Sequence, residues 1–146
     1  MSWYDYDKTR VVLEYRLMYK KYPSYVLCKF EEKLAWEGEV TLIPEGIDAE
    51  PMKVRLVYPE GYPVRPPKVY PLYPELPKEL WGHEWHRWEG GYICHVQPKL
   101  WNVRYTAVDV IEKIHVWYFN YLAYVNKLIP KMPDEGIADI SKNVGD

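Results

Sequence analysis

Near the start of the chain, apolar residues recur four, three and four positions apart, a spacing that places them on one face of an α-helix. They are Val11, Tyr15, Met18 and Tyr22. Asp7 precedes this stripe as a candidate N-cap, and Pro23 follows it as a helix breaker. The pattern therefore predicts a helix from about Asp7 to Lys21.

A second helical pattern lies towards the end of the chain. Thr106, with Asp109 three residues on, resembles a capping box, and Pro130 limits the helix. The apolar stripe between them is broad, as expected for a helix covered on more than one side. Its members are Val110, Ile111, Ile114, Tyr118, Tyr121, Leu122 and Val125.

Between the two helices, apolar and polar residues alternate with the period of two that is typical of half-buried strands. The alternating runs are Val26–Phe30, Leu34–Leu42 and Met52–Tyr58. Short turns join them, so we expect an antiparallel meander with one solvated face. In the proline-rich stretch that follows, only Lys68–Tyr70 is predicted to be a strand, because proline cannot donate to a central ladder.

The order of these elements predicts an α+β fold in which helices flank one sheet. The chain has 146 residues, about one domain by length. We assign residues 1–130 to this domain and residues 131–146, which are weakly patterned, to a loosely structured tail.

Charge and hydropathy exclude two classes of partner. Nineteen Lys and Arg against 21 Asp and Glu leave a net charge of −2, which does not suit sequence-independent binding of nucleic acid. The most apolar stretch, Ile114–Val125, is too short and too polar to span a membrane. Only two cysteines are present, which favours a reducing, cytoplasmic location.

The two cysteines differ in their surroundings. Cys28 shares a predicted strand face with Val26 and Phe30, so it is interpreted as a small buried hydrophobe. Cys94 lies in the irregular segment Leu80–Trp101 and follows two glycines, which allow close approach of another chain. A thiol in that setting is a candidate nucleophile.

Three groups of residues around Cys94 have an order and spacing that match a known family. They are the run YPEGYPVRPPKV at Tyr58–Val69, the element GYIC at Gly91–Cys94, and Trp101 seven residues past the cysteine. Together they resemble the ubiquitin-conjugating enzyme (UBC-fold) family over about Asp7–Tyr124. The resemblance implies an N-terminal helix, an antiparallel meander, an irregular active-site segment and a long C-terminal helix.

The same resemblance implies that Cys94 carries a ubiquitin-like protein as a thioester and passes it to an amine, without metal or cofactor. The family has His-Pro-Asn upstream, with the Asn eight residues before the cysteine. Here His86 holds that position, so it is the candidate for binding the oxyanion. In having a histidine at this position, the chain resembles prokaryotic conjugating-enzyme-like proteins. These include proteins of anti-phage operons that signal through cyclic oligonucleotides.

The resemblance also implies surfaces for protein partners. A basic outer face on the first helix would bind the activating enzyme, and a rigid proline-rich loop would meet a ligase or protein substrate. Trp101 is expected to anchor the chain after Cys94 beside that loop. The residues assigned to partner binding are Arg10, Arg16, Lys20, Tyr62, Pro63, Pro66 and Trp101.

Three other functions remain open on the sequence. The absent asparagine leaves room for a non-catalytic binding module that docks a ubiquitin-like partner. A cysteine hydrolase would need a positioned base, which no clear Cys-His-Asn order supplies. A zinc site would draw its ligands from His83, His86, Cys94 and His95, although adjacent ligands rarely converge on one tetrahedral ion.

Overall fold

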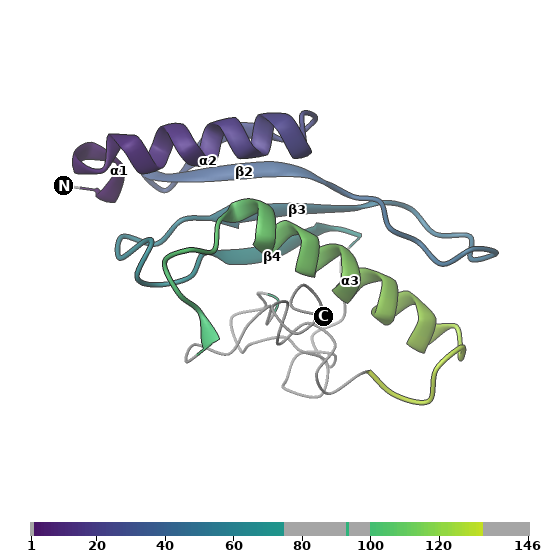
Figure 1. The fold of residues 1–146 in the computed structure, drawn as a ribbon. Coiled ribbons are helices and arrows are strands. Elements are labelled where there is room, and N and C mark those ends of the chain that lie inside the picture. The colour runs from purple at the N-terminus through teal and green to yellow at the C-terminus, as the bar shows by residue number, and fades with distance from the viewer. Residues whose placement is uncertain (1, 75–92, 94–99, 133–146) are drawn as a thin grey trace.

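Helices and an antiparallel sheet make an α+β fold in the computed structural model, which describes residues 2–74, 93 and 100–132 (Figure 1). The elements are α1 (Trp3–Tyr6), α2 (Lys8–Lys21), β1 (Val26–Phe30), β2 (Lys33–Val40), β3 (Met52–Val57), β4 (Lys68–Tyr73) and α3 (Ala107–Val125). The α+β prediction is confirmed, and the short helix α1 is an addition to it.

Helix α2 forms where the pattern predicts it. The Asp7 side chain caps it by accepting a hydrogen bond from the Arg10 backbone N–H at 3.2 Å. The predicted apolar stripe is wrong at Tyr15, which is 49% exposed, while Glu14 is buried with Met18. A helix turns 100° per residue, so position 14 lies closer than position 15 to the direction that faces the sheet.

The four strands form one antiparallel sheet in the order β1-β2-β3-β4, which confirms the meander. On the face towards the helices, Trp36 pairs with Leu56, and Leu56 with Val69; all three side chains are buried. In β1 the prediction that Cys28 shares a buried face with Val26 and Phe30 is wrong. Leu27 pairs with Trp36 and packs against the core, whereas Val26 is 63% exposed.

Strand β4 is longer than predicted and runs through proline. Pro71 pairs with Val54, next to a register shift between Lys53 and Val54. Proline is tolerated here because β4 is the last strand in the sheet order, where an N–H need not complete a ladder.

Helix α3 begins as its sequence predicts. The Thr106 backbone N–H donates to Asp109 Oδ2 at 2.8 Å, the return half of a capping box. The buried face of α3 includes Ile111, Ile114 and Trp117. α3 packs against α2 and also contacts β2 (Figure 1). No helix in the described part of the chain has the length and apolar character needed to cross a membrane.

The packed body extends slightly past the boundary assigned at residue 130. Met132 is buried and belongs to the core cluster. The rest of the assigned tail, residues 133–146, lies outside the described residues.

His115 sits at the junction of α2 and α3. Its ring stacks on Tyr22 at the end of α2, with centroids 5.6 Å apart and planes 14° from parallel. Its Nε2 atom is buried and has no hydrogen-bond partner among the described residues. Burial lowers the pKa of His115, and the nearby Glu112 carboxylate opposes that shift only in part.

We expect acid to weaken this junction through His115. An unfolded histidine takes up a proton near pH 6.5, but the folded protein resists protonation, so the free energy of unfolding falls as pH drops through that range. His115→Phe keeps a ring against Tyr22 and cannot titrate. Thermal unfolding between about pH 7.5 and 5.5 should therefore show a weaker pH dependence in the variant. Equal pH dependence in the two proteins would contradict this assignment.

Candidate functional site

Ile93 is the described residue nearest in sequence to the candidate cysteine. Its side chain is buried, and its backbone N–H donates to the Val69 carbonyl at 2.8 Å, which forms an antiparallel bridge to β4. Cys94 is the next residue in the sequence. Cys94 and His86 themselves lie outside the described residues, as do His83 and His95, so their roles stay predictions.

The predicted partner loop after β3 is tied to the chain that follows the cysteine. Trp101 Nε1 donates to the Pro63 carbonyl at 2.8 Å. Pro63 and Pro66 are half-buried, so part of each remains available to a partner. Tyr62 and Trp101 are only 3% and 8% exposed, because both side chains face inward. Both residues offer little surface to a partner, which corrects their assignment to partner binding, whereas the bond from Trp101 to Pro63 agrees with its expected role as an anchor.

Beneath this loop lies a buried carboxylate that the sequence analysis did not single out. Glu14 is 3% exposed and accepts four hydrogen bonds. Its Oε1 atom accepts from the Tyr58 hydroxyl and from the Ala107 backbone N–H, each at 2.9 Å. Its Oε2 atom accepts from the Tyr62 hydroxyl at 2.6 Å and from Arg10 Nε at 2.9 Å. Glu14 therefore joins α2, the loop after β3 and the first turn of α3.

The pKa shifts of the groups around Glu14 favour the protonated forms that can donate hydrogen bonds to its carboxylate. Burial raises the pKa of the Tyr58 and Tyr62 hydroxyls, and the Glu14 carboxylate raises both further. Both phenols therefore stay protonated and can donate to the carboxylate. Burial opposes the charge of Arg10, but the hydrogen bond that Arg10 donates to the Tyr62 oxygen and the charge of Glu14 outweigh burial and raise the Arg10 pKa.

The Arg10 guanidinium faces inward. Its Nη1 donates to the Val103 carbonyl at 2.6 Å, and its Nη2 donates to the Tyr62 hydroxyl at 2.9 Å and to the Tyr105 carbonyl. These contacts, with the ion pair to Glu14, correct the expectation that Arg10 lies on the outer basic face of the helix.

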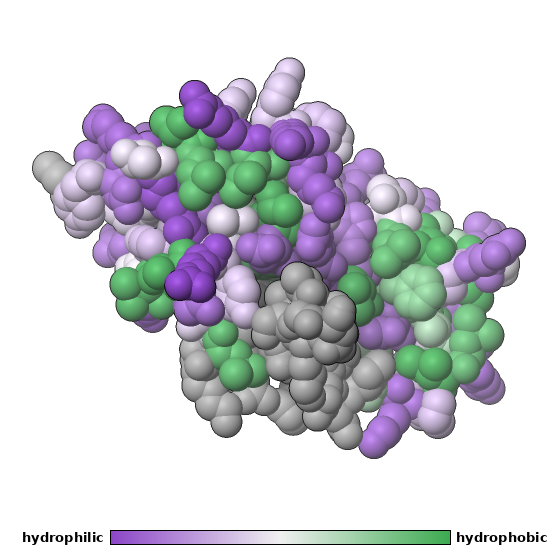
Figure 2. Space-filling view, viewed as in Figure 1, coloured by the Kyte–Doolittle hydropathy of each residue, from purple (hydrophilic) through white to green (hydrophobic). Residues whose placement is uncertain are grey.

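Arg16 and Lys20 do lie on the exposed side of α2. Apolar side chains share that side, including Val12 and Leu13, and Figure 2 shows apolar residues gathered among hydrophilic ones over this helix. Lys21, the last residue of α2, instead pairs with Glu112 of α3 at 2.9 Å. The exposed face thus combines cations, Arg16 and Lys20 among them, with apolar surface.

Cys28, the second cysteine, is half-buried on the sheet face away from the helices, opposite Ala35 of β2. Burial raises the pKa of its thiol, and the charge of Glu37 raises it further. A raised pKa lowers the fraction of thiolate, the reactive form, at neutral pH. Cys28 is therefore a poor nucleophile, although it is less buried than expected.

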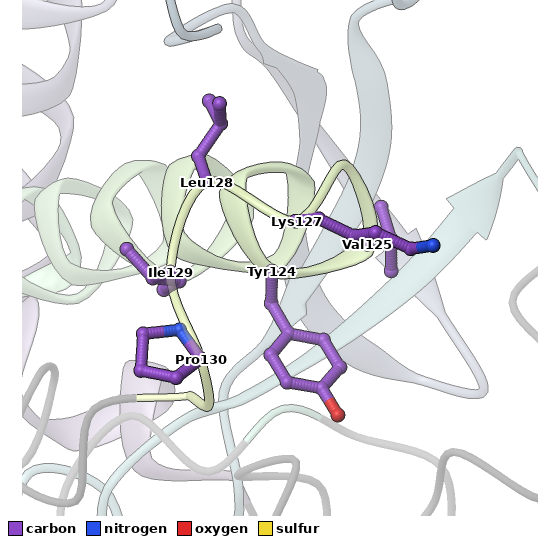
Figure 3. Close-up of a pocket in the computed structure, with 6 residues that line it drawn as sticks. All are labelled: Tyr124, Val125, Lys127, Leu128, Ile129 and Pro130. Atoms are coloured by element: carbon purple, nitrogen blue, oxygen red, sulfur yellow. The ribbon is translucent and has the colours of Figure 1, made fainter.

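Two other kinds of site receive no support in the described region. No three His, Cys, Asp or Glu side chains within residues 2–74, 93 and 100–132 gather as metal ligands would. A hollow at the end of α3 is lined mostly by hydrocarbon, as Figure 3 shows, and contains none of the predicted site residues. Its lining residues are Tyr124, Val125, Lys127, Leu128, Ile129 and Pro130.

Comparisons of the chain with protein-family models, curated proteins and solved structures give no match.

Proposed function

We propose that this chain is a UBC-fold acyl carrier, which takes a ubiquitin-like protein as a thioester on Cys94 and transfers it to an amine. The observation that carries the proposal is the Ile93 bridge, because it ties the residue before Cys94 to the rigid core at β4. The helix, four-stranded meander and long final helix follow the order that the resemblance implies.

The chemistry needs no redox partner and no metal. The Cys94 thiolate attacks the acyl carbon of the thioester on the activating enzyme; a new C–S bond forms, and the enzyme's sulfur leaves as thiolate. An acceptor amine then attacks the same carbon, an amide forms, and the Cys94 thiolate is released as the amine loses its proton. Cysteine suits both steps, because its thiolate is a strong nucleophile and a good leaving group.

His86 is the proposed donor to the oxyanion of the tetrahedral intermediate. One such hydrogen bond contributes about 3 kcal/mol to comparable reactions. An imidazole also titrates near neutrality, unlike the asparagine of the family, so transfer would depend on pH.

The exposed face of α2 is the proposed contact for the activating enzyme, through Arg16 and Lys20 and the apolar side chains that share this face, Val12 and Leu13 among them. Charges at the rim of such a surface mainly raise the association rate. Pro63 and Pro66 are proposed to meet a ligase or protein substrate.

A non-catalytic module that only binds a ubiquitin-like partner is the second candidate. The observation that favours it is the histidine at position 86, where the family has asparagine. Such a module would bind its partner without forming a covalent adduct.

A charging assay separates the two functions. We expect incubation with ATP, Mg²⁺, and the activating enzyme and ubiquitin-like protein of the same genome to give a larger species on non-reducing electrophoresis. Dithiothreitol should remove it, Cys94→Ala should abolish it, and the control Cys28→Ala should keep it within about twofold of the parent. A species that survives Cys94→Ala but is lost in Cys28→Ala would overturn the proposal.

A further inference from the structure

The contacts of Arg10 reach across the fold to the chain that follows Cys94 in sequence. From α2, the guanidinium donates to the carbonyls of Val103 and Tyr105, 93 and 95 residues away. The Trp101 indole holds the same segment to the Pro63 carbonyl at 2.8 Å. Residues 101–105 are therefore attached to both α2 and the loop after β3.

Glu14 holds the guanidinium in this orientation. It accepts from Arg10 Nε at 2.9 Å and from the Tyr62 hydroxyl at 2.6 Å, and that hydroxyl in turn accepts from Arg10 Nη2. The guanidinium also lies over the Tyr62 ring, 5.1 Å from its centroid. The planar guanidinium of arginine has five N–H donors and can make these contacts together. A lysine ammonium cannot reach all of them.

We propose that Arg10 and Glu14 are positioning residues for the reaction at Cys94, acting through residues 101–105. This inference rests on the proposed function. Upstream of the cysteine, the Ile93 bridge attaches the chain to β4. Downstream, the Arg10 guanidinium and the Trp101 indole attach residues 101–105 to α2 and to the loop after β3. The two attachments set the end points of the segment that bears the nucleophile.

Position matters because small displacements of a reacting group slow chemistry steeply; a shift of about 1 Å can cost 100-fold in rate. Arg10→Lys keeps the charge next to Glu14 but loses the contacts to residues 103 and 105. The substitution should therefore lower the rate of the chemical step more than the affinity for the charged activating enzyme.

Arg55→Lys is the matched control. Arg55 also pairs with a carboxylate, Glu37 at 2.7 Å, and also lies over an aromatic ring, that of Phe30 at 4.1 Å. Its pair is on the sheet face away from the helices and makes no contact with residues 101–105 among the described interactions. Arg10 makes more buried contacts than Arg55, so Arg10→Lys should lose more thermal stability. The reaction is therefore compared at a temperature at which both variants are fully folded, and only Arg10→Lys should affect it.

The experiment uses the full chain with Cys28→Ser as the background, so that Cys94 is the only thiol. Single-turnover charging gives the maximal rate and the half-saturating concentration of charged activating enzyme. We expect Arg10→Lys to lower the maximal rate about tenfold with half-saturation within about twofold, and Arg55→Lys to match the background. Trp101→Phe, which keeps the ring and loses the bond to Pro63, is the second variant and should also lower the maximal rate.

Alkylation of Cys94 by iodoacetamide, followed by mass spectrometry, provides a second readout that needs no protein partner. Arg10→Lys should change the alkylation rate at least about threefold, and Arg55→Lys should leave it near the background value. If folded Arg10→Lys and Trp101→Phe both charge and alkylate like the background, the inference is wrong. If the background protein never charges, the proposed function fails, and alkylation alone then decides whether Arg10 sets the reactivity of Cys94.

Discussion

Glu14→Ala should lower the free energy of unfolding by about 3–5 kcal/mol, the usual cost of removing one partner from a buried ion pair. The variant would leave the half-buried guanidinium of Arg10 without its carboxylate. It would also leave the Tyr58 hydroxyl and the Ala107 N–H without an acceptor in a buried region, and each such loss adds to the cost. Equilibrium unfolding in urea measures the effect.

Two control variants test whether the loss of stability is specific to the buried carboxylate of Glu14. Glu14→Gln keeps the volume but offers an N–H₂ group where a carboxylate oxygen accepts two donors, so it should also destabilise the fold, by less than alanine. Glu45→Ala removes an exposed carboxylate from the turn before Gly46 and should stay within about 0.5 kcal/mol of the parent. A loss below about 1 kcal/mol for Glu14→Ala would show that the carboxylate is not the centre of the cluster.

Local patterns predict most of the described secondary structure, because helices and alternating strands depend on neighbours in sequence. Met52, Val54 and Leu56 alternate in the chain and are all buried in the structure. The pattern fails in β1, where Val26, Leu27 and Cys28 are all apolar and alternation cannot choose a face. The register with β2 makes that choice, and it depends on a different strand.

The buried charges could not be predicted in the same way. Periodicity assigns charged residues such as Arg10 and Glu14 to a solvated face by default. Their burial depends on acceptors and donors more than 90 residues away, at Val103, Tyr105 and Ala107. The available signal was the position of Glu14, three residues after Val11 and four before Met18, on the face that the stripe directs to the core.

The candidate site, too, is predicted only in part by the sequence motif. The motif joins the Tyr62–Pro67 loop with Trp101 in sequence order, and the structure brings Trp101 against Pro63. That Tyr62 points inward follows from its bond to Glu14, which the motif does not encode, whereas the anchoring of Trp101 is what the resemblance implies. Cys94 and His86 lie outside the described residues, so the nucleophile and its proposed helper rest on the resemblance.

Cys94→Ser should change the chemistry of the adduct and leave its site unchanged. The serine hydroxyl would attack the same acyl carbon, so a C–O bond forms, the C–S bond to the activating enzyme breaks, and the hydroxyl proton leaves with that sulfur. Serine is a far weaker nucleophile than cysteine without an adjacent base, so charging should slow at least about 100-fold. The ester that accumulates should resist dithiothreitol, because neutral thiols cleave thioesters far faster than oxygen esters.

The most direct measurement is therefore the lability of the adduct in Cys94→Ser, after long incubation with the charged activating enzyme. Dithiothreitol should leave the ubiquitin-like protein attached to this variant, sodium hydroxide should release it, and the parent protein should lose it to either reagent. A thiol-labile adduct that persists in Cys94→Ser would place the acyl group on another residue and contradict the account.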